Sequence, residues 1–145
     1  MRNRGKAVGL VIGMALSSVV SANDSASEQA HAKFSPAELQ QAQEIFNKIN
    51  LEAQPYLVSV SECYMDHEHL DSCNAGQDGI PKEITSSTQN ISGLTVTQGI
   101  ITITPKAQAV ITEHDKLIIT PSINSENQIT WVFSGPAVEA ELFKK

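Results

Sequence analysis

Apolar residues recur at spacings of three and four between residues 39 and 64, with polar and charged residues between them. This pattern predicts one amphipathic helix of about 28 residues. Ser35 and Glu38 have the spacing of a capping box around Pro36, which marks the helix start. Pro55 is expected to kink the helix. The apolar stripe consists of Leu39, Ala42, Ile45, Phe46, Ile49, Ala53, Tyr56, Leu57, Val60 and Tyr64.

The pattern changes to alternating, β-branched residues in the second half of the chain, after a loop over residues 66–82. Such alternation is typical of strands with one buried face. One long helix followed by a run of short strands predicts an α+β domain. We expect the helix to pack on an antiparallel β-meander of about four strands. The candidate strands are residues 94–97, 100–104, 107–112, 117–120 and 129–134.

The N-terminus has the pattern of a secretory signal peptide over residues 1–22. Arg2, Arg4 and Lys6 precede an apolar run of about 14 residues, which is shorter than the roughly 20 residues of a spanning helix. We expect cleavage between Ala22 and Asn23; the alternatives are an uncleaved anchor and a cleavage site further along the chain.

This pattern divides the chain into a signal peptide (1–22), a flexible polar tether (23–34) and a globular domain (35–145). The protein is then expected in the periplasm or outside the cell, with no membrane insertion after cleavage.

The net charge excludes some classes of binding partner. The 145 residues carry a net charge of −6, and the part after residue 22 has seven basic against sixteen acidic side chains, or −9. A surface this acidic argues against binding nucleic acid or anionic lipid, both of which require clustered Lys and Arg.

Two cysteines, Cys63 and Cys73, lie ten positions apart. An exported protein keeps disulfides, and two cysteines allow one pairing, so we expect a Cys63–Cys73 bridge. The alternative is a pair of free thiols.

The segment between the cysteines is the densest cluster of charged and metal-binding residue types in the chain. We interpret it as a candidate interaction loop. His67 and His69 are weak candidates for copper or zinc ligands, because imidazole suits both ions. The alternative is a solvated acidic loop, and no cofactor is expected. The residues are Asp66, His67, Glu68, His69 and Asp71.

The sequence contains no pattern of a known catalytic site: no G-x-S-x-G, H-E-x-x-H or phosphate-binding loop is present. His114 and Asp115 are expected in a turn, and Trp131 on a core-facing strand position with Ile129 and Phe133. We therefore expect a protein that is not an enzyme.

Several fragments in a fixed order resemble the type IV pilin family. They are SECY (61–64), CNAG (73–76), GIP (79–81), GLTVTQGIITITP (93–105) and LIITPSINSENQITWVFSGPA (117–137). The resemblance spans about residues 36–137 and implies the pilin head fold, in which a long helix packs on an antiparallel sheet.

The sequence also departs from the family. Gly5-Lys6 is not followed by the pattern of a prepilin leader and apolar assembly helix, and no acidic residue precedes Asp24. Phe133 stands about where the family often has a cysteine. The chain resembles a pilin head domain without the leader and membrane helix.

The resemblance implies a non-enzymatic exported protein that acts in type IV pilus biology or cell adhesion through protein–protein contacts. Its expected partners are pilin-family proteins or a pilus assembly component. One alternative is a periplasmic regulator that binds pilins without entering the fibre. Another is a small-ligand or metal-binding module that uses His67 and His69.

Overall fold

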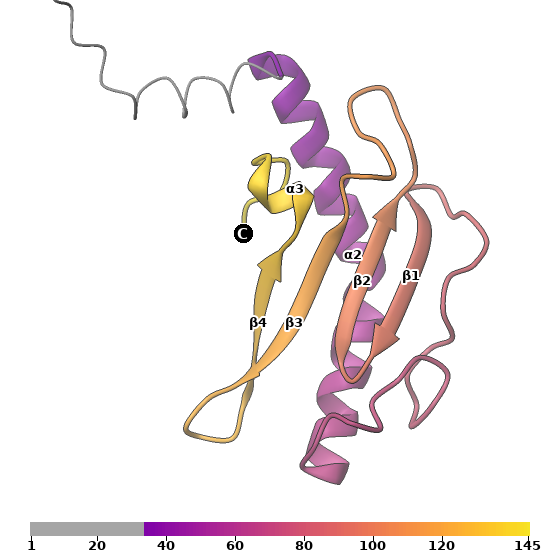
Figure 1. Cartoon of the computed structure of the whole chain (residues 1–145), viewed down its shortest axis with the longest axis vertical. Coiled ribbons are helices and arrows are strands. Elements are labelled where there is room, and N and C mark those ends of the chain that lie inside the picture. The colour runs from indigo at the N-terminus through magenta and orange to yellow at the C-terminus, as the bar shows by residue number, and fades with distance from the viewer. Residues whose placement is uncertain (1–33) are drawn as a thin grey trace, which may run out of the picture.

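The computed structural model describes residues 34–145, which form a helix packed on a four-stranded sheet (Figure 1). The elements in chain order are α2 (Pro36–His67), β1 (Ile91–Thr97), β2 (Ile100–Pro105), β3 (Leu117–Ile123), β4 (Ile129–Ser134) and α3 (Pro136–Glu139). The predicted signal peptide, its cleavage site at Ala22 and Asn23, and the tether up to residue 33 lie outside the described residues.

Helix α2 begins where the capping box predicts. The Glu38 amide donates to Ser35 Oγ (3.3 Å), and the Ser35 amide donates to Glu38 Oε2 (2.7 Å). The helix has 32 residues and runs on through Pro55 as one element. Pro55 and Leu51 are exposed, so water can reach the Leu51 carbonyl that proline leaves without a donor. The kink at Pro55 stays a prediction.

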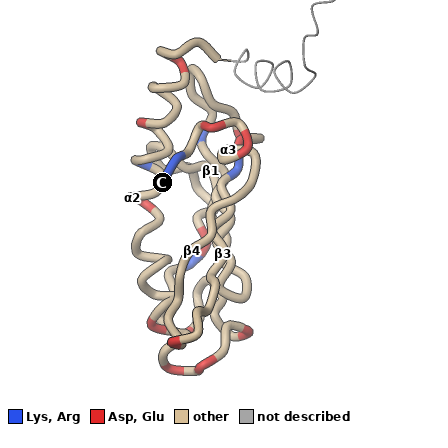
Figure 2. Tube along the Cα trace, turned by 90° about the vertical axis from the view of Figure 1, so that its left-hand side faces the viewer, with Lys and Arg blue, Asp and Glu red and all other residues tan. Residues whose placement is uncertain are grey.

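The four strands are antiparallel neighbours in the order β1-β2-β3-β4, which confirms the predicted meander. The helix covers one face of the sheet, and Figure 2 shows the two layers edge-on. Alternate strand residues point into the core between the layers. The fully buried ones include Leu94, Val96, Ile101, Ile103, Leu117 and Ile119, and the helix contributes Phe46, Ile49 and Val60.

The prediction of a strand over residues 107–112 was wrong. Residues 107–112 form a tight turn in which the Gln108 and Ile111 backbones exchange hydrogen bonds. The neighbouring Asp115 carboxylate accepts from the amide (2.7 Å) and hydroxyl (2.9 Å) of Thr112, so local side-chain bonds replace sheet pairing.

Strands β1 and β3 are each three residues longer than predicted, and β2 is one residue longer. Strand β1 begins at Ile91, before a bulge that precedes Gly93. Strand β3 passes through Pro121, which pairs with Trp131 on β4. Proline is tolerated there because β3 pairs with β2 only up to Ile119, so no ladder bond is lost on that side.

Within residues 34–145, no helix combines the length and the apolar character needed to cross a bilayer.

Candidate functional site

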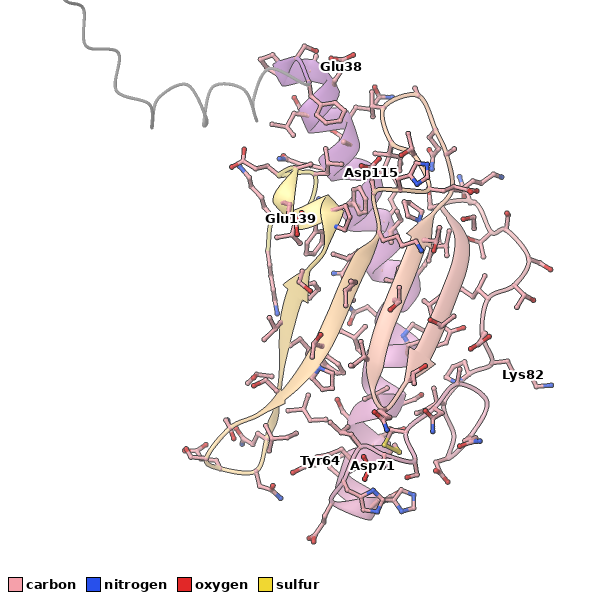
Figure 3. The ribbon with its side chains drawn as sticks, viewed as in Figure 1. Glu38, Tyr64, Asp71, Lys82, Asp115 and Glu139 are labelled. Atoms are coloured by element: carbon pink, nitrogen blue, oxygen red, sulfur yellow. A yellow bond between two sulfur atoms is a disulfide. The ribbon has the colours of Figure 1, made fainter. Side chains whose placement is uncertain are left out.

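Cys63 and Cys73 form the disulfide bond that the sequence predicts, with their Cα atoms 5.9 Å apart. Both residues are buried. The bridge joins the last turns of α2 to the loop that follows, close to the labelled Tyr64 and Asp71 (Figure 3).

The loop after the disulfide is fastened to the β1–β2 turn. The Gly99 amide donates to the Cys73 carbonyl (2.8 Å), and the Ala75 amide donates to the Val96 carbonyl (3.0 Å). The Gln98 amide also donates to Asn74 Oδ1 (2.9 Å). These bonds and the disulfide hold the helix end, the loop and the hairpin as one unit.

The five residues of the candidate interaction loop lie at this end of the molecule, and all are exposed. One expectation was wrong: Asp66 and His67 belong to the last turn of α2 rather than to a loop. Glu68 then reverses the chain with a φ of 58°, and its amide donates to the Tyr64 carbonyl. Acidic residues gather at this end, as Figure 2 shows.

His67 contacts a residue that the sequence did not single out. Its Nε2 lies 3.6 Å from Asp78 Oδ1, while its ring centroid lies 5.9 Å from that of His69. Asp78 adopts a φ of 47° just before Gly79, which returns the loop toward the helix end. In the sequence, Gly76 and Gly79 indicate a turn in this segment. They do not identify Asp78 as the residue that His67 contacts.

A groove of about 330 Å³ separates α2 from β4. Trp131 and Phe133 line its strand side, and Asn50, Gln54 and Ser61 line its helix side. Both aromatic residues are half-buried and pack against the core, as their strand positions predict.

Helix α2 also carries a row of exposed apolar side chains beside this groove. Leu51, Val58 and Met65 are 69%, 54% and 69% exposed. They are seven residues apart, so they fall on one face of the helix. Glu52 is the charged residue between positions 49 and 61. Its carboxylate accepts from Thr88 and Asn90, so it turns toward the β1 side of the fold.

His114 and Asp115 do not form a catalytic pair. The Asp115 carboxylate is occupied by Thr112, and His114 is exposed. The pair lies in the turn before β3, as expected.

Comparison with known proteins supports the pilin resemblance. No family model matches the chain. Prepilin peptidase-dependent protein D of Escherichia coli K12 is 29% identical over 76 residues, which is 52% of this chain and 49% of that protein. The match therefore spans about half the length of this curated relative.

A solved structure shares the fold. The solution structure of the major type IV pilin PpdD from enterohemorrhagic E. coli superimposes with a TM-score of 0.52 at 23% identity, covering 66% of this chain and 68% of that one. In sequence and in fold, this chain resembles type IV pilins.

Proposed function

We propose that this protein is a non-enzymatic, exported pilin-like protein that acts in type IV pilus biology by binding pilin-family proteins. The observation that carries the proposal is the exposed row Leu51, Val58 and Met65 on α2. Contiguous exposed apolar surface marks protein contact sites, and Val58 joins this row to the groove lined by Trp131 and Phe133.

The proposed occupant of this surface is a helix of a pilin-like protein. Residues seven apart occupy one of the two heptad positions along which helices pack. The half-buried Trp131 and Phe133 in the neighbouring groove extend this apolar surface, and aromatic side chains commonly anchor interfaces.

A second candidate function uses the same surface: a periplasmic regulator that binds pilins without entering the fibre. The observation that favours it is the complete capping box at the start of α2. A helix that has its own N-terminal cap before Pro36 suits a domain that works without a continuous assembly helix.

Site-specific photocrosslinking in the producing cells tests the proposal. A photoreactive residue at Val58 should give covalent products with pilin-family proteins, identified by mass spectrometry. Lys82 serves as the matched control, because it is exposed at the far side of the fold from β4 (Figure 3). A third probe at Asp71 tests the acidic loop that the sequence favoured as a contact or adhesion surface.

Crosslinks to pilin-family proteins at Val58 but not at Lys82 support the proposal. Products in sheared pili indicate a fibre component, whereas products confined to the periplasm indicate the regulator. No crosslink at Val58, or equal crosslinking at Val58 and Lys82, would overturn the α2 surface as the site of contact.

A further inference from the structure

The end of α2 and the loop after Cys73 bring together two kinds of metal-binding side chain. His67 comes from the last turn of the helix and Asp78 from the loop, with 3.6 Å between Nε2 and Oδ1. Both side chains are more than a third exposed, so an ion can reach them. We propose that His67, Asp78 and His69 form a binding site for a divalent transition-metal ion of the zinc class.

The separation of the two ligand atoms fits such an ion. Zinc binds imidazole nitrogen and carboxylate oxygen at about 2.0–2.2 Å in tetrahedral geometry. Two ligand atoms on one zinc ion then lie roughly 3.3–3.5 Å apart. The observed distance therefore needs a shift of only a few tenths of an ångström.

His69 supplies the third ligand. Its ring centroid lies 5.9 Å from that of His67 and its side chain is exposed, so its ring must rotate toward the ion to complete the set. Two imidazoles with one carboxylate select zinc or copper over calcium and magnesium, which prefer oxygen ligands.

The Cys63 sulfur lies within 4.8 Å of the ligand atoms of His67 and Asp78. It takes no part as a ligand, because it is oxidised in the disulfide and a thiolate is required for metal binding. Its contribution is to hold the helix end beside the loop.

The loop that carries Asp78 has a defined conformation. The Gln77 amide donates to the Asn74 carbonyl (3.1 Å), and the Ile80 amide donates to the Gln77 carbonyl (2.8 Å). The backbone that carries Asp78 is thus ordered before an ion binds. A bound ion would add a second crosslink beside the disulfide and stabilise the folded state.

Calorimetric titration of the purified, oxidised protein with zinc chloride tests the site. We expect one ion per chain, with affinity at least about tenfold weaker in His67→Ala and in Asp78→Asn. His114→Ala is the matched control and should bind as the wild type does. His114 is also an exposed histidine beside an aspartate, but that carboxylate is occupied by Thr112.

A second measurement does not depend on variants. Zinc should shift the imidazole NMR signals of His67 and His69 and leave those of His114 in place, and it should raise the melting temperature of the wild type. The proposal is overturned if no binding occurs at about 1 mM zinc, a weak limit of specific affinity. Unchanged affinity in His67→Ala, or a shift centred on His114, would overturn it equally.

Discussion

The Gly99 amide donates to the Cys73 carbonyl at 2.8 Å, so the β1–β2 turn is bonded directly to a disulfide cysteine. Through that cysteine the turn is linked to Cys63 on α2. The two layers of the fold are therefore joined at this end by a covalent bond and a backbone hydrogen bond in series. Of the proposed metal ligands, His67 lies on α2 and Asp78 lies on the loop that follows Cys73.

Gly99→Ala should destabilise the protein by about 3 kcal/mol. Gly99 has a φ of 77°, and a Cβ there would lie 2.9 Å from Leu70 Cδ2 and 3.1 Å from Pro121 Cγ. The substitution combines backbone strain with overpacking. Urea unfolding followed by circular dichroism measures the loss.

Gly79→Ala is the control that measures the backbone strain of a positive φ without side-chain crowding. Gly79 has a φ of 79°, but a Cβ there meets nothing within 4 Å. We expect a loss of about 1 kcal/mol. Equal losses in the two variants would mean that the crowding at Gly99 contributes nothing.

Reduction of the disulfide should lower the free energy of unfolding by about 3 kcal/mol. The bridge spans ten positions, and closing a loop of this size restricts the unfolded chain. The measurement compares urea midpoints of the oxidised protein and of Cys63→Ala/Cys73→Ala. Coincident unfolding curves would contradict the prediction.

Ser35→Ala should cost about 1 kcal/mol at neutral pH, because the first turn of α2 loses a side-chain acceptor for the Glu38 amide. The Ser35 amide and hydroxyl lower the pKa of Glu38 below its ordinary value of 4.5. A lowered pKa in the folded state stabilises the protein above pH 4.5, and this contribution is lost as the pH falls through the folded value.

Glu38→Gln should therefore reduce the loss of stability in acid, measured as the urea midpoint against pH. The control is Glu44→Gln, an exposed carboxylate in the interior of the same helix. Identical acid profiles for the wild type and Glu38→Gln would refute the role of the capping box.

Tyr56→Phe should cost about 1 kcal/mol, because the phenol donates to the Lys82 carbonyl at 2.7 Å and ties α2 to the loop before β1. Burial raises the pKa of Tyr56 above its ordinary value of 10.0. The folded state thus favours the protonated phenol, so this contribution is present below pH 10 and is lost as the pH rises through the raised pKa. Between neutral pH and a pH above 10, the urea midpoint should fall less in Tyr56→Phe than in the wild type. An equal fall in the two proteins would contradict the prediction.

Most of the fold could be predicted from the sequence, because local chemistry and long-range packing agree there. Ser35, Pro36 and Glu38 mark the helix start, and alternating β-branched residues mark the strands. The prediction failed at 107–112, where the apolar residues also suit a strand, but hydrogen bonds that Thr112 donates to the Asp115 carboxylate favour a turn.

The candidate site was less predictable. The cysteine pairing followed from the count of cysteines and from export, but the contact of His67 with Asp78 did not. It depends on positive φ angles at Glu68 and Asp78, and neither residue is a glycine that would signal such a conformation. The exposed row on α2 was also missed, since one apolar stripe already accounted for the helix as core.

Val58→Glu should separate binding from folding. Val58 is 54% exposed, whereas Val60 two positions along is fully buried. We expect Val58→Glu to change the free energy of unfolding by less than about 0.5 kcal/mol, because glutamate suits an exposed helix position. A negative charge on the proposed helix-packing seam should still sharply reduce crosslinking to pilin-family proteins from a photoreactive residue at Leu51.

Val60→Ala is the matched control, because it should lower stability without affecting binding. It should cost about 2 kcal/mol by removing two buried methyl groups. Because its side chain faces the sheet, crosslinking from Leu51 should persist under conditions where the variant remains folded. If Val58→Glu crosslinks as well as the wild type, the row on α2 is not the contact surface. If Val60→Ala alone abolishes crosslinking while folded, the partner recognises the interior packing of the domain rather than this exposed seam.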